Sequence, residues 1–322
     1  MNEEQVLKRI ASEAKPARLA AAGVHLGIGD DAALFKPRAG HQMILTCDWS
    51  LEETHFLRDK HPADAVGWKS LARAVSDIAA MGGTPRCYLL SLALPSTHTG
   101  RWLTEFLGGL RRASRAFHCE LAGGDTTRRE QILINITVVG EIAPKHALQR
   151  AGARAGDLIF VSGKLGEADR GWERLQKLRG KVKKDDRLLR KHLYPEPRLA
   201  LGEWLAENRL ATAAMDVSDG LSIDLMRLCT ASGVGARVDV ACLPKLQDVE
   251  RGKAVKLALH GGDDYELLFT VAPRKVCQIP RSFRGLPLSQ IGKITREHKM
   301  EVRAEDGSVR RLQPGGWDPF RR

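Results

Sequence analysis

The sequence predicts an α/β protein with two domains. Short apolar segments that read as buried strands alternate along the chain with amphipathic helical segments. A length of 322 residues is enough for two domains of ordinary size, and 43% hydrophobic residues allow both to bury a core. The character of the sequence changes near residue 150, at a polar, glycine-bearing link. We therefore expect an N-terminal domain of residues 1–149 and a C-terminal domain of residues 150–322.

The helices are predicted from apolar residues that recur at helical spacing. The first is short and amphipathic, at residues 3–14. The longest begins at Pro62 and ends at Met81, before two glycines, and its buried stripe includes Leu71 and Val75. Further helices are expected at 102–117, through Gly171 and Leu175, at 199–208, and from a Ser218-Asp219 cap to Gly233.

The strands are predicted from short apolar runs, at residues 42–47, 88–94, 132–139, 158–161, 212–217, 236–241 and 267–271. The run at 158–161 continues into Ser162-Gly163-Lys164-Leu165-Gly166, and a helix follows. This order of strand, glycine turn and helix is able to present backbone N–H groups to an anion. A tight turn without a ligand is the alternative, because the GxxxxGK[ST] pattern is absent.

Acidic residues recur in what read as loop settings. In Gly27-Ile28-Gly29-Asp30-Asp31-Ala32, the glycines allow a tight turn beside two carboxylates. Neighbouring carboxylates about 4 Å apart repel by roughly 4 kcal/mol at an effective dielectric of 20, so they favour a cation between them. The further acids of this kind are Asp48, Asp77, Asp125, Asp216, Asp219 and the pair Asp263-Asp264.

Each of these acids also has a plainer interpretation. The GIGDDA stretch is compatible with a solvated polar turn, and Asp77 with an Arg73–Asp77 surface pair on one helix. Ser218 and Asp219 are ordinary helix caps. It is the number of such acids that favours metal binding over these local explanations.

Magnesium is the metal that this residue set favours. It prefers oxygen ligands and typically uses one or two carboxylates per ion together with substrate phosphates, so several ions around a polyphosphate would use this many aspartates. The absence of paired His or Cys ligands argues against zinc. Nucleophile-elbow, Rossmann and protein-kinase motifs are absent as well. The residues alone indicate a magnesium-dependent phosphoryl-transfer enzyme.

Composition limits the other classes of protein. The net charge of +12 invites a nucleic-acid interpretation, but the only dense basic run lies between Arg174 and His192, and a solvated helix or loop explains it more plainly than phosphate contact. No apolar run of about 18 residues exists, so we expect no membrane span. We see no secretion signal, and six scattered cysteines without a CxxC pair suit reduced thiols in a cytoplasm.

Taken together, these motifs resemble the thiamine-monophosphate kinase family of the aminoimidazole-ribonucleotide-synthetase-like superfamily. The matching segments, in the family's order over nearly the whole chain, are GIGDDAALF (27–35), TCDWSLEETHF (46–56), SDIAAMGG (76–83), AGGDTT (122–127), LQRAGARAGD (148–157), DVSDGL (216–221), GGDDYEL (261–267) and GGWDPF (315–320).

The resemblance implies a fold and a reaction. The N-terminal α/β domain would join its strands to those of a partner in a homodimer, and a C-terminal α/β domain would complete the active site. The reaction would be transfer of a phosphoryl group from ATP to thiamine monophosphate, giving ADP and thiamine diphosphate, with several magnesium ions per site. The implied partners are therefore these two substrates, with no nucleic acid and no membrane.

The resemblance also assigns residues. The implied magnesium ligands, some through backbone oxygens, are Asp30, Thr46, Cys47, Asp48, Asp77, Asp125, Asp216 and Asp219. The implied ATP contacts are Gly124, Asp125, Arg150 and Ser218. His55, Asp263 and Trp317 would hold thiamine phosphate, and Asp30, Asp125, Asp216 and Asp219 form the catalytic group.

Four residues depart from the family's usual pattern. Cys47 stands where threonine or serine is usual, and Glu53 replaces a glycine. Asp263 replaces a glutamate, which shortens its reach by one methylene, and Pro319 replaces a frequent histidine. The Glu167-Ala168-Asp169 stretch also departs from the family's small-residue version. None of these changes removes an implied metal-binding aspartate.

Sister enzymes of the superfamily are the main rivals. An aminoimidazole-ribonucleotide or selenophosphate synthetase would share much of this pattern, but the latter would be expected to carry a reactive Cys or selenocysteine near its start, and no cysteine precedes Cys47. A nucleotide- or nucleic-acid-binding protein without enzyme activity is the rival from another class, suggested by the charge.

Overall fold

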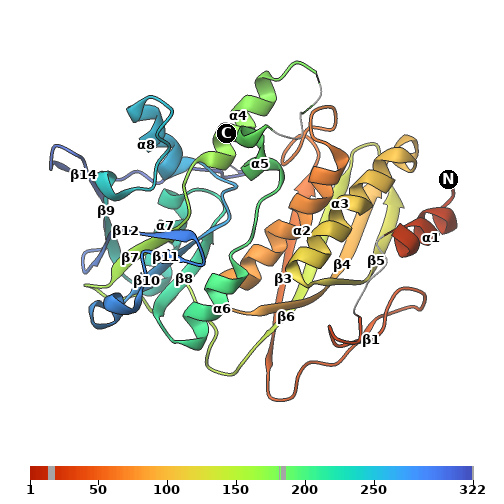
Figure 1. Ribbon diagram of the computed structural model, residues 1–322, viewed down its shortest axis with the longest axis horizontal. Coiled ribbons are helices and arrows are strands. Elements are labelled where there is room, and N and C mark those ends of the chain that lie inside the picture. The colour runs from red at the N-terminus through yellow and green to blue at the C-terminus, as the bar shows by residue number, and fades with distance from the viewer. Residues whose placement is uncertain (14–18, 181, 183–185, 321–322) are drawn as a thin grey trace.

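Two sheets lie side by side in the computed structural model, which describes residues 1–13, 19–180, 182 and 186–320. The first sheet comes from the N-terminal part of the chain and the second from the C-terminal part (Figure 1). Within the described ranges, no helix is long and apolar enough to cross a membrane. The six cysteines are free thiols.

The N-terminal sheet has four strands in the described part of the chain. Their order is β3 (Gln42–Leu51), β6 (Leu133–Ile142), β4 (Thr84–Leu94) and β5 (Glu120–Arg128). The strands β4 and β5 are parallel and are joined by helix α3 (Arg101–Phe117), whereas the other neighbours are antiparallel. Helices α2 (Ala63–Ala80) and α3 cover one face (Figure 1). Helix α1 (Glu3–Glu13) and the hairpin of β1 (Val24–Leu26) and β2 (Leu34–Phe35) precede this unit.

The C-terminal sheet is larger. Among the described residues its order is β14 (Val309–Arg311), β13 (Met300–Arg303), β9 (Gly235–Asp239), β12 (Leu286–Thr295), β7 (Leu158–Ser162), β10 (Glu266–Val271) and β8 (Ala211–Val217), with β11 (Ser282–Phe283) paired to β12. The accompanying helices are α4 (Glu167–Lys177), α5 (Arg187–Leu193), α6 (Leu199–Glu207), α7 (Leu221–Ser232) and α8 (Arg251–His260). Short 3-10 turns lie at Ser96–His98, Val240–Cys242 and Pro273–Gln278.

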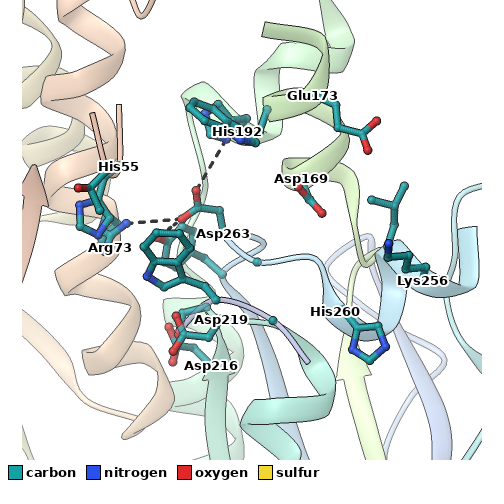
Figure 2. A pocket seen from close by; sticks show the side chains of 18 of the residues that line it. His55, Arg73, Asp169, Glu173, His192, Asp216, Asp219, Lys256, His260 and Asp263 are labelled. Atoms are coloured by element: carbon teal, nitrogen blue, oxygen red, sulfur yellow. Dashed lines mark hydrogen bonds and ion pairs between the residues drawn. The ribbon is translucent and has the colours of Figure 1, made fainter. Parts of the chain in front are cut away.

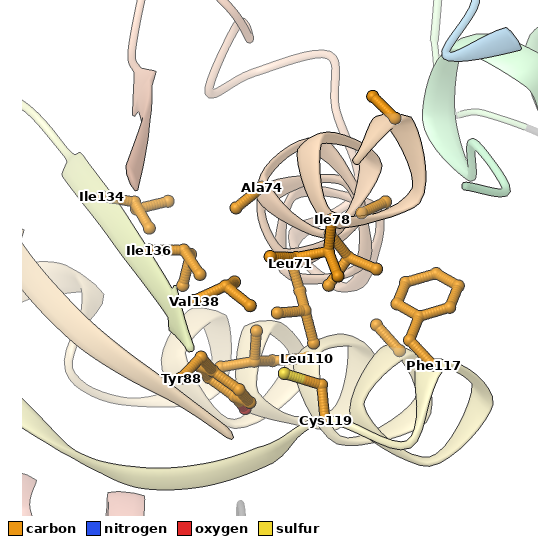
Figure 3. Close-up of a cluster of buried hydrophobic side chains, with 14 of the residues drawn as sticks. Leu71, Ala74, Ile78, Tyr88, Leu110, Phe117, Cys119, Ile134, Ile136 and Val138 are labelled. Atoms are coloured by element: carbon orange, nitrogen blue, oxygen red, sulfur yellow. The ribbon is translucent and has the colours of Figure 1, made fainter. Parts of the chain in front are cut away.

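Helix α2 is buried on both sides. Its Leu71 and Ile78 are completely buried and pack with Tyr88 and Ile136 of the first sheet and with Leu110 of α3 (Figure 3). The same core continues into residues of the second half, Leu201, Leu205, Ala214 and Phe269. A second core, which includes Val161, Met215, Leu225 and Leu268, lies on the other face of the C-terminal sheet. Because apolar burial is the main favourable term in folding, α2 ties the two halves together.

Most predicted elements are confirmed, with corrections at their ends. The helix expected from Pro62 is α2, with Pro62 at its N-cap and Met81 at its C-cap. The helix expected at 3–14 ends at Glu13, and Ala14 lies outside the described residues.

The interpretation of the aspartates as loop residues is wrong for four of them. Asp48 lies in β3, Asp77 in α2, Asp125 in β5 and Asp216 in β8. Apolar runs underestimate strands whose polar residues face a pocket or an open sheet face, because only one face of such a strand needs to be apolar.

Two adjacent glycines of α3 have different roles. A Cβ atom on Gly109 would lie 1.8 Å from the carbonyl oxygen of Asp64 in α2, so glycine is required where these helices cross. A Cβ atom on Gly108 would meet nothing within 4 Å. The glycine pair therefore does not interrupt the helix, which runs through both positions.

We predict opposite effects for alanine at these two positions. Gly109→Ala is expected to destabilise the fold by about 1–3 kcal/mol, because the helices must separate. Gly108→Ala is expected to stabilise it by about 0.5–1 kcal/mol, because alanine loses less conformational entropy in a helix than glycine does. Urea unfolding of both variants checks this, and equal effects would contradict the packing described here.

Candidate active site

A cavity of about 750 Å³ lies between the two halves of the molecule. His55 and Arg73 enter it from the N-terminal half, and Asp216, Asp219 and Asp263 enter from the C-terminal half (Figure 2). Its lining also includes Asp48, Asp77, Asp169, Trp172, His192, Ser218, Lys253, Lys256, His260, Tyr265 and Trp317. The cavity thus unites many of the residues that the sequence singles out.

Four aspartates form an acidic wall. Asp48 points from β3, Asp77 from α2, Asp216 from the end of β8, and Asp219 from the turn that follows. Hydroxyl groups orient two of them: Thr46 Oγ1 donates a hydrogen bond to Asp77, and Ser76 Oγ donates to Asp216 Oδ2 at 2.8 Å. The sheets and α2 bring together acids that are far apart in sequence.

Burial disfavours the ionised form of three carboxyl groups in this wall, those of Asp48, Asp77 and Asp216. Burial raises the pKa of Asp48 to about 6, against the opposing charge of Arg73. Burial and the neighbouring Asp77 raise the pKa of Asp216, and burial raises that of Asp77. Like charges in a partly buried site favour a bound cation. The oxygen-only donors of the wall fit magnesium, which typically needs only one or two carboxylates per ion.

Hydrogen bonds to the side chain of Asp224 fix the turn between β8 and α7. The backbone N–H groups of Ser218, Asp219 and Gly220 all donate to Asp224 Oδ2, at 3.0–3.1 Å. The interpretation of Ser218 and Asp219 as helix caps is therefore wrong, since Asp224 accepts these bonds and Gly220 occupies the N-cap. Both side chains instead reach the cavity.

Asp263 is the centre of the opposite wall. Lys69 Nζ donates to its Oδ2 at 2.7 Å, and the Tyr265 hydroxyl donates to its Oδ1 at 2.7 Å. Arg73 lies 3.5 Å from Oδ1. Burial alone would raise the pKa of Asp263, but Lys69, Arg73 and His192 outweigh it and lower that pKa. Asp263 is thus held as an anion.

His55 and Trp317 lie close to each other and line the cavity beside this wall. Their ring centroids are 6.4 Å apart. The backbone N–H of Trp317 donates to the backbone carbonyl of Asp219 at 2.9 Å, which holds the C-terminal tail over the cavity. The Leu51 N–H donates to His55 Nδ1 at 3.0 Å. Burial, followed by the charge of Arg73, lowers the pKa of His55 to about 4, so the imidazole is neutral at pH 7.

Other predicted ligands do not line this cavity. Asp125, Ser91, Asn135 and Trp49 are paired across the four strands and so form one row of the sheet. Residues in one row share a face of a sheet. Asp48 belongs to the next row, with the fully buried Ile136, so Asp125 and Asp48 are on opposite faces.

The remaining predicted residues are placed as follows. Asp30 is exposed, and Gly27 of the same loop approaches Ala122 at the start of β5. Cys47 is exposed in β3. Arg150 is close enough to Asp77 to lower its pKa.

Gly124 has a structural reason to be glycine. Its φ is +155°, and a Cβ atom would lie 1.9 Å from the carbonyl oxygen of Leu90. Glu53, where the family usually has glycine, has a φ of +64°, in the left-handed region that glycine adopts freely. The backbone shape expected of a glycine is therefore kept at Glu53.

The described residues contain no set of three or more His, Cys, Asp or Glu side chains arranged to hold a metal ion by themselves. Four backbone N–H groups of the glycine turn after β7 are already bonded within the protein. The N–H groups of Gly166 and Ala168 donate to Asp264, and those of Gly163 and Leu165 donate to backbone carbonyls. The structure therefore favours the tight-turn interpretation.

The described residues of the basic run lie at the end of α4, in α5 and in the segment between these helices. Lys191 donates to the buried Glu266 at 3.0 Å, and His192 is buried beside the cavity. Lys181, Lys183 and Lys184 lie outside the described residues.

Sequence reasoning missed the basic side chains beside Asp263, which are Lys69, Arg73 and His192, and it missed His61, which contacts His192. The alternative of an Arg73–Asp77 surface pair is wrong, because Arg73 points to Asp48 and Asp263. No local pattern links Lys69 of α2 to Asp263, which lies 194 positions further along the chain. The only available signal is that Lys69 and Arg73 lie four residues apart, on one face of a mostly apolar helix.

The two histidines form a buried pair. The Leu57 N–H donates to His61 Nδ1 at 3.0 Å, which leaves the proton of His61 on Nε2. That atom lies 3.0 Å from His192 Nε2, and His192 Nδ1 faces Lys69 Nζ at 3.4 Å and Asp263 Oδ2 at 3.8 Å. Burial and the charge of Lys69 lower both pKa values, that of His61 to about 3.

Residues 29–142 match the family model for AIR synthase related protein, N-terminal domain, and residues 154–305 match that for the C-terminal domain. Hydrogenase maturation protein HypE of E. coli shares the fold, with a TM-score of 0.78 at 17% identity. The fold is therefore that of an α/β protein with two AIR synthase related domains.

Proteins with higher sequence identity to this chain identify its family within the AIR synthase related proteins. The chain is 37% identical over 305 residues to the thiamine-monophosphate kinase of Escherichia coli K12, with 92% of each chain covered. The crystal structure of thiamine-monophosphate kinase from Stenotrophomonas maltophilia has a TM-score of 0.83 at 36% identity, covering 96% of this chain and 98% of that one. AaThiL complexed with AMPPCP and TMP has a TM-score of 0.77 at 33% identity, covering 91% and 92%. The chain belongs to the thiamine-monophosphate kinase family.

The neutral histidine pair predicts a pH dependence of stability. The unfolded chain has a histidine pKa of about 6.5, so it takes up a proton before the folded state does as pH falls. The contribution of neutral His61 to stability is therefore fully present above about pH 6.5 and is lost as pH falls toward 3. His61→Gln, which cannot take up this proton, should lose less stability between pH 7 and pH 4 than the wild type, by on the order of 2 kcal/mol.

Urea unfolding at the two pH values measures this difference. The exposed His298 provides the control, because His298→Gln should keep the wild-type dependence. An unchanged dependence in His61→Gln would exclude the buried neutral state.

Proposed function

We propose that the protein transfers a phosphoryl group from ATP to thiamine monophosphate, giving thiamine diphosphate, the last step in making that cofactor. Kinases of this name are 33–37% identical over most of the chain, and a relative was solved with an ATP analogue and TMP. The observation that carries the proposal is one cavity with an acidic wall on one side and the Asp263, His55 and Trp317 wall on the other.

The acidic wall suits the phosphate groups of both substrates. We propose that Asp48, Asp77, Asp216 and Asp219 hold magnesium, with Thr46 orienting Asp77. Magnesium bound there would neutralise and bridge phosphate oxygens of donor and acceptor. Ser76 and Asp224 keep the carboxylate of Asp216 and the turn at Asp219 in place.

The acceptor needs no general base. Its phosphate has a second pKa near 6, as phosphomonoesters do, and is largely ionised at neutral pH. Neutral His55 is therefore assigned to binding, and the work of the protein is positioning and charge compensation. Trp317, which is half exposed, is available to stack on the cationic thiazolium or the pyrimidine ring.

We assign Asp30, Asp125, Gly124 and Arg150 to the ATP end of the site, with Cys47 contributing a backbone oxygen to magnesium. Asp30 and Asp125 belong to neighbouring segments, because the GIGDDA loop approaches β5. Arg150 lies near Asp77, so it can connect this group with the acidic wall.

We also propose that the protein is a cytoplasmic homodimer with domains at 1–149 and 150–322. Met43, Leu45 and Trp49 alternate along β3 and are 47–66% exposed, and Leu89 of β4 is 39% exposed. Such an open apolar sheet face favours association with a second copy. Sedimentation of the wild type against a Leu45→Glu variant tests the dimer.

Carboxylate removal tests the site. Asp216→Asn and Asp30→Asn should each lower the turnover of thiamine monophosphate by at least about 100-fold with the fold intact, because a neutral amide cannot compensate cation charge. Turnover under limiting magnesium and urea unfolding measure the two effects. The control is Asp59→Asn, an exposed acid outside the cavity. Wild-type rates in both site variants would contradict the assignment.

His55→Ala tests the substrate side. Loss of the imidazole beside Trp317 should raise the KM for thiamine monophosphate several-fold more than the KM for ATP. Steady-state kinetics with each substrate varied in turn measures this. An equal effect on both KM values would contradict the role of His55, and product analysis separates this kinase from its sister synthetases.

A further inference from the structure

Arg73 projects from α2 toward Asp263 and lines the cavity next to His55 (Figure 2). Its side chain is only 14% exposed. It stands between the two walls, 3.9 Å from Asp48 of the acidic wall and 3.5 Å from Asp263 of the opposite wall. A group bound against Arg73 would therefore lie between the predicted metal ligands and the predicted thiamine ligands.

The donors of Arg73 are not fully used by the protein. Among the described residues, its Nε finds no hydrogen-bond partner, and its two ion pairs are long. Lys69, the other cation on this face of α2, already has partners within the protein. Its Nζ lies 2.7 Å from Asp263 and 3.4 Å from His192. Arg73 is thus the cation of this pair that has donors left for a ligand.

A buried guanidinium with unused donors is costly unless something satisfies it. The planar fork of arginine matches phosphate oxygens in a bidentate manner, and its charge persists at every working pH. The nearby carboxylates of Asp48 and Asp263 lie too far away to make that contact themselves. The unsatisfied donors and the position between the walls point to an anionic group of the acceptor.

We propose that Arg73 binds the phosphate group of thiamine monophosphate and so makes the site select the phosphorylated vitamin over free thiamine. This inference rests on the proposed function. It assigns to α2 a binding residue that supplies positive charge to the acceptor independently of magnesium.

The proposal predicts a loss of affinity confined to the phosphorylated ligand. Without magnesium, Arg73→Gln should weaken binding of thiamine monophosphate about 10- to 100-fold, the usual effect of removing a hydrogen bond to a charged group, and should change thiamine binding less than about 3-fold. Isothermal titration calorimetry with both ligands measures this difference. Arg73→Lys keeps the charge without the fork and should give an intermediate loss.

Arg86 provides a matched control. It is 19% exposed, forms an ion pair with Glu141 at 3.3 Å, and its Nε also lacks a hydrogen-bond partner among the described residues, but it does not line the cavity. Arg86→Gln should bind both ligands as the wild type does. Urea unfolding establishes that each variant is folded. If Arg73→Gln does not fold, the affinities of Arg73→Lys for thiamine monophosphate and thiamine test the proposal instead.

Two results would overturn the proposal: equal losses for thiamine and thiamine monophosphate, which indicate a purely structural role, or wild-type affinity for both. Failure of the proposed function is distinguishable, because it would appear in the wild type itself as absence of ATP-dependent turnover of thiamine monophosphate.

Discussion

The burial of α2 between two sheets is the constraint on which the site depends. One side of this helix packs on the N-terminal sheet and α3, and the other packs on α6 and the C-terminal sheet. A helix held from both sides cannot rotate without losing apolar contacts. Its polar residues Lys69, Arg73, Ser76 and Asp77 are therefore fixed at the seam, where they meet side chains from the other half.

Charge distribution divides the cavity into two parts. On one side, burial, and to a smaller extent neighbouring carboxylates, raise the pKa values of Asp48 and Asp216. On the other, Asp263 is held as an anion by Lys69, Arg73 and Tyr265. Arg73 touches both parts, so the two walls are electrostatically connected within a single chain.

Sequence reasoning predicted features that depend on neighbouring residues, and it missed contacts between residues far apart in the chain. The bounds of α2 were predictable because Pro62 and the glycines after Met81 act on the adjacent backbone. The full length of β3 was not predicted, and β5 was missed altogether, because polar residues interrupt the apolar pattern where one face of the sheet is open. The partners of Arg73 could not be predicted, because Asp263 reaches it only through tertiary packing. The separation of Asp48 from Asp125 follows from strand alternation once the strands are known to continue.

The turn after β8 has a consequence for how tightly a ligand can be held. Asp224 accepts three backbone N–H groups of that turn, so the loop keeps its shape by internal bonds. A loop that is already ordered loses little conformational entropy when a ligand arrives. More of the contact energy made by Ser218 and Asp219 is then available as affinity, and this part of the cavity is preorganised.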